Sequence, residues 1–345
     1  MSDSGYKAKT FEQGSQVPLG RPGSPRGTRP AQQVAERGLS AVRAVPGPLL
    51  GLILVCAALS FLSPYFLTSR NLMNVFSQVS EVGIMAAGAA LVIITGGIDL
   101  SVGAVLALSL MINAWLYQNV GVPFPLSAAT GLLVGALVGL VNGALVTFGR
   151  IQPFVATLAT MSACGGLAMY ITNGGPITGF PDYFTAITSN RVLGVSVDML
   201  ILVAVYVLIA FWLRFRPGGR ALYALGGNEE VARLSGLNVR RTKVTVYVIA
   251  GVLAALAGLI VGSRLDAAHP TAGVNDLLSV IAVVVIGGAS LAGGSGTMLG
   301  TFIGLLIIGV LRNGMALLNV SPNIQPVVIG FAIIVAVMLD RRSRQ

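Results

Sequence analysis

An aspartate stands inside an otherwise apolar stretch, in the run TGGIDLSVG that begins at Thr95 and contains Asp99 and Ser101. A charged side chain at the centre of a membrane-spanning helix costs about 2.5 to 3.5 kcal/mol on insertion scales, so such residues usually face a protein interior or a polar path. The spacing allows two roles for Asp99. Its carboxylate can accept hydrogen bonds from the free amides of a helix that begins near Ser101, or it can contact a solute that crosses the membrane.

Other polar side chains inside apolar stretches are further candidates for a translocation path. They share groups that can exchange hydrogen bonds with a hydrated solute. With the aspartate, the candidates are Gln78, Glu81, Asp99, Ser101, Asn113 and Asn142. Glu81 is expected near the outer end of its stretch, where its carboxylate can also extend to the membrane surface.

The chain offers little for metal, nucleotide or covalent chemistry. Cys56 and Cys164 lie inside apolar stretches and are expected to pack as small apolar residues. His269 is the single histidine and has no second His or Cys nearby, so no metal site is predicted. The sequence contains no Gly-Lys dipeptide and therefore no Walker A loop. We expect no cofactor on this chain and no enzyme activity.

The elements that position these residues are predicted to be membrane-spanning helices. The chain has 345 residues, of which 54% are hydrophobic and 10% are charged, whereas soluble domains have about 25% charged residues. Since a spanning helix needs roughly 20 apolar residues, the sequence predicts an all-α integral membrane protein with about ten spans. The predicted spans are 48–66, 78–96, 101–117, 125–148, 153–172, 195–213, 244–262, 277–292, 297–312 and 324–339.

The charged residues orient these spans. Residues 1–45 are basic, rich in Gly, Pro and Ser, and lack apolar periodicity, so we expect a disordered head before a transmembrane domain over 46–345. Most of the basic residues fall on the side of this head, which places both termini in the cytoplasm. The basic residues of the head are expected to help orient the first span, with contact to anionic lipid head groups as the second alternative. Because the basic residues are not gathered on one domain, no nucleic-acid partner is expected.

An internal repeat links two pairs of spans. Asn142-Gly-Ala-Leu followed by Ile151-Gln-Pro recurs as Asn313-Gly-Met-Ala-Leu followed by Ile324-Gln-Pro. The repeat matches the fourth and fifth spans to the ninth and tenth. Because this offset is an odd number of spans, the two halves must lie in opposite orientations, as in the inverted-topology repeats of many transporters.

The predicted cytoplasmic loop 214–243 contains a short helix over 229–235. Asn228 is a helix-capping residue type, two glutamates follow it at the positive end of the helix, and Gly236 supplies a left-handed stop. So short a helix must be held by packing. Val231 and Leu234 offer a small apolar face to a partner. From these features alone, an incidental helical turn in a basic loop is an equal alternative.

Four motifs, in order, carry a family resemblance. They are GGIDLSVG at 96–103, GGNEEVARLSGL at 226–237, PTAG at 270–273 and VIGGASLAGG at 285–294. Together they resemble the permease family of monosaccharide ABC importers, the ribose, xylose, arabinose and galactose group. The resemblance covers roughly Leu50 to Arg342. Amino-acid permeases of the wider superfamily are less similar, because they lack the GGIDLS run.

The resemblance implies partners. It implies a second permease copy or a paralogue, a periplasmic sugar-binding protein, and a cytoplasmic ATPase that binds ATP and Mg, all at the bacterial inner membrane. It also implies that the short helix couples this chain to the ATPase through Asn228, Glu229, Glu230, Val231, Ala232, Arg233, Leu234 and Gly236. Three charged residues in predicted periplasmic loops are candidate contacts for the binding protein, namely Arg191, Arg264 and Asp266.

One segment departs from the family pattern, and two other functional classes are considered. After the PTAG motif the family usually has a Tyr-Glu-Leu-Asp type of segment, whereas this chain has Asp276-Leu-Leu-Ser279. An ATP-independent secondary transporter could share the inverted repeat, but it would need ionisable groups in the membrane interior. A membrane anchor would need neither the glycine-rich spans nor the capped helix.

Overall fold

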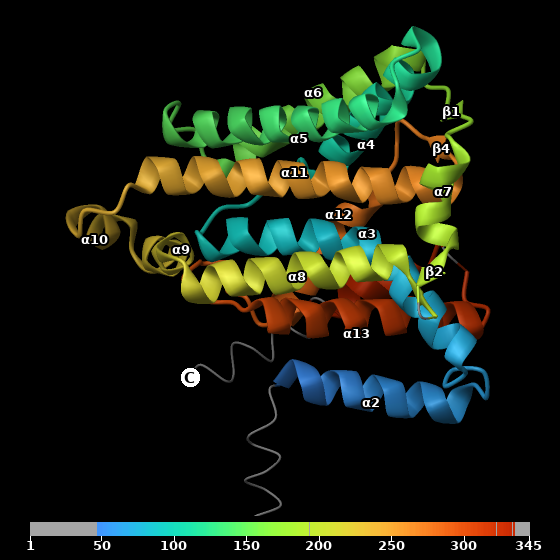
Figure 1. Ribbon diagram of the computed structural model, residues 1–345. Coiled ribbons are helices and arrows are strands. Elements are labelled where there is room, and N and C mark those ends of the chain that lie inside the picture. The colour runs from blue at the N-terminus through green and yellow to red at the C-terminus, as the bar shows by residue number, and fades with distance from the viewer. Residues whose placement is uncertain (1–46, 193, 322, 333, 335–345) are drawn as a thin grey trace, which may run out of the picture. The chain divides into compact units, whose positions relative to one another are not determined.

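The computed structural model describes residues 47–192, 194–321, 323–332 and 334, and these residues are almost entirely helical (Figure 1). The expected basic head over 1–45 and the end of the predicted span 324–339 lie outside the described residues. Everything below concerns the part of the chain from residue 47 onward, which clusters as one compact unit.

Six described helices are long and apolar enough to cross a membrane. They are α3 (Ser69–Ile94), α5 (Phe124–Thr147), α6 (Pro153–Thr172), α8 (Val197–Phe215), α11 (Val239–Leu265) and α13 (Met298–Leu317). Three shorter apolar helices accompany them, namely α2 (Gly47–Leu62), α4 (Val102–Trp115) and α12 (Leu277–Ile286). The structure thus supports a multi-pass helical membrane protein, while the number of ten spans stays a prediction.

The predicted span 277–292 is wrong as a single helix. Helix α12 ends at Ile286, and the chain turns at Gly288, whose φ of +86° suits glycine. A loop then leads to α13. A similar break follows α3. Gly96 has a φ of +77°, and the chain is not helical from there to Ser101. Each break lies between two helices and exposes backbone groups that another segment must bind.

Glycines bring the central helices into close contact. On α5, a side chain at Gly135 or Gly139 would overlap the backbone of Gly251 or Tyr247 on α11. The helices cross at small residues, which is the packing that membrane helices use in place of a hydrophobic driving force. Because residues 135, 139 and 143 of α5 meet residues 251, 247 and 244 of α11, the two helices are antiparallel.

The directions of the helices bear on the predicted repeat. Helix α11 is also antiparallel to α3, since Gly88 meets Ala250 and Glu81 meets Arg264. Helix α13 is antiparallel to α3, since residues 309 and 313 meet residues 79 and 71. Helices α5 and α13, which carry the repeated asparagines, therefore run in opposite directions. An inverted repeat requires this arrangement, although the repeat itself stays a prediction.

Short segments close the two ends of the bundle. Strand β1 (Ile177–Thr178) pairs with β4 (Ala267–Ala268), and β2 (Arg191–Val192) pairs with β3 (Val195–Ser196). These strands and α7 (Asp182–Ser189) lie at one end, whereas α9 (Pro217–Gly227) and α10 (Glu229–Leu234) lie at the other end (Figure 1). The remaining short elements are η1 (Leu116–Val120), which extends α4, and η2 (Val274–Asp276), which precedes α12.

Candidate functional site

Helix α10 forms where the sequence predicts it, one residue shorter at its C-terminal end. The Asn228 side chain accepts a hydrogen bond from the Val231 amide at 3.0 Å, and Gly236 has a φ of +82°. Both ends of the helix are therefore set by the residues that the sequence analysis singled out. The alternative that this helix is an incidental turn without a coupling role is a statement about function, and the local geometry does not test it.

Helix α10 presents an apolar face to its surroundings. Val231 is 57% exposed and Leu234 is 78% exposed, while Ala232 is buried against the protein. Lys243 of α11 binds Glu229 at 2.7 Å and ties the helix to the bundle. Exposed branched apolar side chains on a short, anchored helix form the kind of surface that inserts into a groove of another protein.

The helix preceding α10 contacts the break that follows α3. A Cβ atom on Gly226, near the end of α9, would overlap the Ile94 carbonyl and the Gly294 amide. That amide donates a hydrogen bond to the Ile94 carbonyl at 2.9 Å. Three of the four motifs named above therefore meet at one place, which we call the glycine junction and define by Ile94, Gly96, Gly226, Gly293 and Gly294.

Tyr223 adds a side-chain contact to the glycine junction. Its hydroxyl donates to the Gly296 carbonyl at 2.9 Å, which links α9 to the loop between α12 and α13. Burial raises the pKa of Tyr223, so its hydroxyl stays protonated and remains a donor at neutral pH. The sequence analysis did not select this tyrosine, because a lone tyrosine carries no spacing signal.

The break after α3 leads into a chain of buried polar groups. Asp99 is 7% exposed, and its carboxylate accepts from the Ser101 amide at 2.8 Å and from the Ser101 hydroxyl at 2.6 Å. The Asn142 amide donates to the same hydroxyl at 2.9 Å, and Thr160 donates to Asn142 at 2.7 Å. The turn role of Asp99 is thus visible in its hydrogen bonds. Contact with a solute stays a prediction.

The structure separates the remaining path candidates. Asn113 is fully buried near the C-terminal end of α4, where it accepts from Ser127 at 2.8 Å and is not bonded to this polar chain. Gln78 is exposed on α3 and joins none of these groups. Three of the six candidates, namely Asp99, Ser101 and Asn142, are therefore connected by hydrogen bonds.

Glu81 belongs to a charged group at the end of the bundle away from α10. It binds Arg264 at 3.2 Å, while Arg312 contacts Asp276 at 3.3 Å and Ser279 at 2.6 Å. Glu81, Arg264 and Asp276 line a cavity of about 270 Å³. The altered segment 276–279 thus supplies a carboxylate and a hydroxyl that hold Arg312.

The three charged residues that were predicted to lie in periplasmic loops have different positions in the structure. The placement of Arg264 in a loop is wrong, because it lies in the last turn of α11 and pairs with Glu81. Asp266 is in a loop, but its carboxylate accepts from the Phe180 amide at 3.0 Å and so holds the chain internally. Arg191 is exposed at the start of the β2–β3 turn. Binding-protein contact by these residues stays a prediction.

Asp198 is a buried acid that the sequence analysis missed. It lies in the first turn of α8 with no exposed area, and it accepts from Ser80 at 3.1 Å. Its second carboxylate oxygen has no hydrogen-bond partner among the described residues. An acid at the edge of an apolar stretch resembles a surface residue in sequence, so only the packing of α8 against α3 shows its burial. No group of three potential metal ligands occurs within the described residues.

Comparisons with known proteins connect this arrangement to a family. A family model described as the permease component of the branched-chain amino acid transport system matches residues 71–337. The ribose import permease RbsC of Bacillus subtilis is 47% identical over 299 residues, which cover 86% of this chain and 92% of that protein.

Further relatives are named for other sugars, and no solved structure matches the chain. The D-allose transport permease AlsC of Escherichia coli is 38% identical over 296 residues, which cover 86% of this chain and 91% of that protein. The L-arabinose ABC transporter permease AraH of Azospirillum brasilense is 35% identical over 298 residues, which cover 86% and 88%. The chain therefore belongs to the permease family of monosaccharide ABC importers.

Proposed function

We propose that this chain is the transmembrane subunit of an ATP-driven importer that moves a monosaccharide across the bacterial inner membrane. ATP and Mg would bind to a separate ATPase, and a periplasmic binding protein would deliver the sugar. Two permease chains, either identical or paralogous, would enclose the path. The observation that carries the proposal is the exposed apolar face of the capped, anchored helix α10, in a chain whose relatives are named as sugar permeases.

In this proposal α10 docks into the ATPase, and the glycine junction passes its movement to the bundle. Gly226 contacts both the break after α3 and the loop after α12, so a displacement of α9 and α10 must shift these two segments together. ATP binding can bias an inward-facing against an outward-facing bundle only if the ATPase contacts α10 differently in its two states. The required bistable element is the pair of helix breaks at Gly96 and Gly288.

The substrate we propose is a small aldose, because the relatives are named for ribose, allose and arabinose. Hydroxyl-rich solutes are recognised by side chains that both donate and accept hydrogen bonds. Ser101, Asn142 and Thr160 are of this kind. No bond of the sugar is expected to break or form during transport.

The topology that we propose has both termini in the cytoplasm and an inverted repeat. The opposite directions of α5 and α13 support the repeat, and the gathering of arginines near α9 and α10 supports a cytoplasmic position for that end. The altered segment 276–279 would then face the periplasm with the Glu81 and Arg264 pair.

A specific observation supports the second candidate function, an ATP-independent transporter. Proton-coupled carriers keep ionisable groups within the bundle. Asp198 is such a group, because it is fully buried and one of its carboxylate oxygens lacks a partner among the described residues. If transport were driven by protons, Asp198→Asn would abolish uptake, whereas an ATP-driven importer would retain it.

The deciding experiment places this chain, its ATPase and the candidate binding protein in proteoliposomes. ATP hydrolysis is measured across a panel of pentoses and hexoses, together with uptake of each labelled sugar. Stimulation by one sugar, with uptake that depends on ATP, is the expected result and would identify the substrate. Uptake without ATP, abolished in Asp198→Asn, would replace the importer by the secondary transporter.

A further inference from the structure

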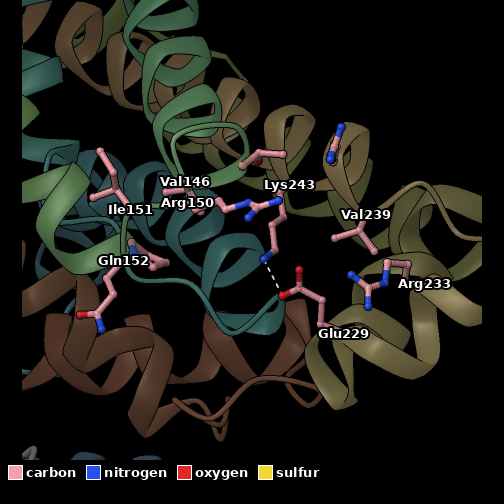
Figure 2. Close-up of a pocket in the computed structure, with 11 residues that line it drawn as sticks. Val146, Arg150, Ile151, Gln152, Glu229, Arg233, Val239 and Lys243 are labelled. Atoms are coloured by element: carbon pink, nitrogen blue, oxygen red, sulfur yellow. Dashed lines mark hydrogen bonds and ion pairs between the residues drawn. The ribbon is translucent and has the colours of Figure 1, made fainter.

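Two adjoining cavities lie where α10 meets the ends of α5, α6 and α11. The larger one, of about 580 Å³, is lined by groups from all four helices and from the loop between α5 and α6 (Figure 2). The smaller one, of about 360 Å³, adjoins it through Arg240. We call them the basic cavity and the apolar cavity.

Cations dominate the lining of the basic cavity. Its ionisable residues are Arg150, Glu229, Arg233, Arg240 and Lys243. Figure 2 shows Arg150 entering from the loop after α5 and Lys243 entering from α11, where it binds Glu229. Arg233 binds Glu230 outside the cavity. Arg150 and Arg240 form no ion pair within the described part of the chain, so two positive charges in the cavity lack a counter-ion.

Two helix ends add to this positive field. Helices α6 and α11, of 20 and 27 residues, begin at Pro153 and Val239, and both residues line the basic cavity. Gln152 precedes α6 without a side-chain hydrogen bond to the first turn. The amides of a helix N-terminus and the helix dipole attract anions. Helix α11 is already capped, because the Asn238 side chain accepts from the Arg241 amide, so the arginines without an ion pair and the N-terminal end of α6 are what favour a phosphate-like anion.

The apolar cavity shows which anion fits. Arg240 lies over the Phe148 ring at 5.9 Å, and the cavity is lined by Phe148, Asn238, Arg240, Arg241, Val244 and Thr245. Phe148 itself follows the end of α5 and is 64% exposed. A free phosphate has no apolar group that could contact this surface. A phospholipid places a phosphate beside an acyl chain and matches both cavities.

We propose that the basic cavity binds the head group of an anionic phospholipid, with an acyl chain in the apolar cavity. The bound phosphate would neutralise Arg150 and Arg240 and lie beside the Lys243–Glu229 ion pair that anchors α10. The lipid would therefore stabilise the position of the proposed docking helix. Basic pockets between membrane helices on the cytoplasmic side bind lipid head groups in other membrane proteins.

The test uses the purified full-length chain in neutral detergent. Phosphatidylglycerol or phosphatidylcholine is titrated, and bound lipid is counted by native mass spectrometry. We expect phosphatidylglycerol to bind at least about tenfold more tightly, and Arg150→Gln with Arg240→Gln to remove most of this preference. Raising the KCl concentration should weaken phosphatidylglycerol binding to the unaltered chain, which needs no substitution.

A matched control keeps the number of charges equal. Arg214→Gln with Arg216→Gln removes two exposed arginines at the same end of the bundle but outside both cavities. Arg214 also lies over a phenylalanine, Phe215, at 5.7 Å, as Arg240 does over Phe148. The control variant should retain the preference for phosphatidylglycerol over phosphatidylcholine. An equal loss of this preference in both double variants would overturn the proposal of a specific site.

Three other outcomes would also overturn the proposal. Equal binding of the two lipids that is unaffected by salt would exclude an anion site. Displacement of phosphatidylglycerol by inorganic phosphate at similar concentration would assign the basic cavity to free phosphate. If no lipid binds and the ATPase instead protects Arg150 and Arg240 from chemical modification, the surface belongs to an acidic part of that partner.

Discussion

At the scale of single residues, buried polar groups form pairs across helices. Asn71 and Asn313 exchange two hydrogen bonds, of 2.9 and 2.8 Å, between α3 and α13, and Asn142 bridges Ser101 and Thr160. A buried amide that loses its partner costs about 1 to 3 kcal/mol. These residues therefore fix the positions of the helices relative to one another.

The Asn71–Asn313 pair can be tested by a double-mutant cycle. Asn71→Ala and Asn313→Ala should each destabilise the protein, and the double variant should be less destabilised than the sum, by about 0.6 to 1.7 kcal/mol. Asn71→Ala leaves the Asn313 amide without its partner, whereas Asn313→Ala leaves Asn71 only its hydrogen bond to the Phe66 carbonyl, and the double change removes both amides. Unfolding of the purified protein in mixed micelles, followed by circular dichroism, measures the difference. Strict additivity would show that the amides do not interact.

Two substitutions of Asp99 distinguish a structural role in the turn from contact with the transported solute. Asp99→Asn keeps the side-chain oxygen that accepts from the Ser101 amide, whereas Asp99→Leu removes it. We expect Asp99→Asn to retain at least about half of the sugar uptake and Asp99→Leu to lose about 1 kcal/mol of stability together with most uptake. Uptake assays on equal amounts of inserted protein check this. A loss of uptake in Asp99→Asn, with unchanged stability, would instead favour contact with the solute.

At the scale of elements, the glycine junction connects segments that are far apart in sequence. Gly226 lies against Ile94 and Gly294, but its neighbour Gly227 has open space at its Cβ position. The sequence analysis located the three motifs that meet here by their family resemblance. It could not predict their meeting, because glycine spacing within one segment says nothing about which backbone approaches it.

Gly226→Ala and Gly227→Ala form a matched pair. The added methyl group at 226 must displace the Ile94 carbonyl and the Gly294 amide, so we expect sugar-stimulated ATP hydrolysis to fall at least about tenfold. The same methyl group at 227 should leave it nearly unchanged. Hydrolysis by the assembled importer, with membrane insertion checked by immunoblot, gives the measurement. Equal activity of the two variants would remove the glycine junction from the coupling route.

The stop of α10 allows a second matched comparison. Gly236 and Gly121 have φ values of +82° and +79°, have open space around them, and donate their amides to the Arg233 and Leu116 carbonyls. Proline at either site removes the donor and forbids the positive φ. Gly236→Pro should uncouple ATP hydrolysis from uptake, whereas Gly121→Pro should affect stability alone. Normal uptake with Gly236→Pro would contradict the coupling role of α10.

Local signals predicted α10 well, but they failed where packing decides the outcome. The caps of α10 lie within a few residues of the helix, so Asn228 and Gly236 define it without tertiary contacts. Arg264 and Asp198 were misjudged or missed because both lie at the edge of an apolar stretch, where a charge is equally compatible with solvent. Their hydrogen-bond and ion-pair partners, Ser80 and Glu81, lie on α3, which is distant in sequence.

At the scale of the whole molecule, the contacts show that α3 and α5 run in one direction and α11 and α13 in the other, but they do not show which end faces which side of the membrane. Hydrophobicity predicted the spans because a run of roughly 20 apolar residues is the length that a helix needs to cross the membrane. It overestimated the span at 277–292, since a ten-residue helix followed by a glycine turn has the same composition as a longer helix. Sidedness was inferred from charge and needs a direct test.

Cysteine labelling tests the sidedness in intact cells. In a background with Cys56→Ala and Cys164→Ala, an impermeant maleimide should label Arg191→Cys from outside, because Arg191 is exposed at the end opposite α9 and α10. Arg216→Cys, exposed beside α9, should react only after the membrane is permeabilised. The excess of arginine near α9 and α10 predicts this orientation. Labelling of Arg216→Cys in intact cells would invert the topology, and with it the proposed docking of the ATPase at α10.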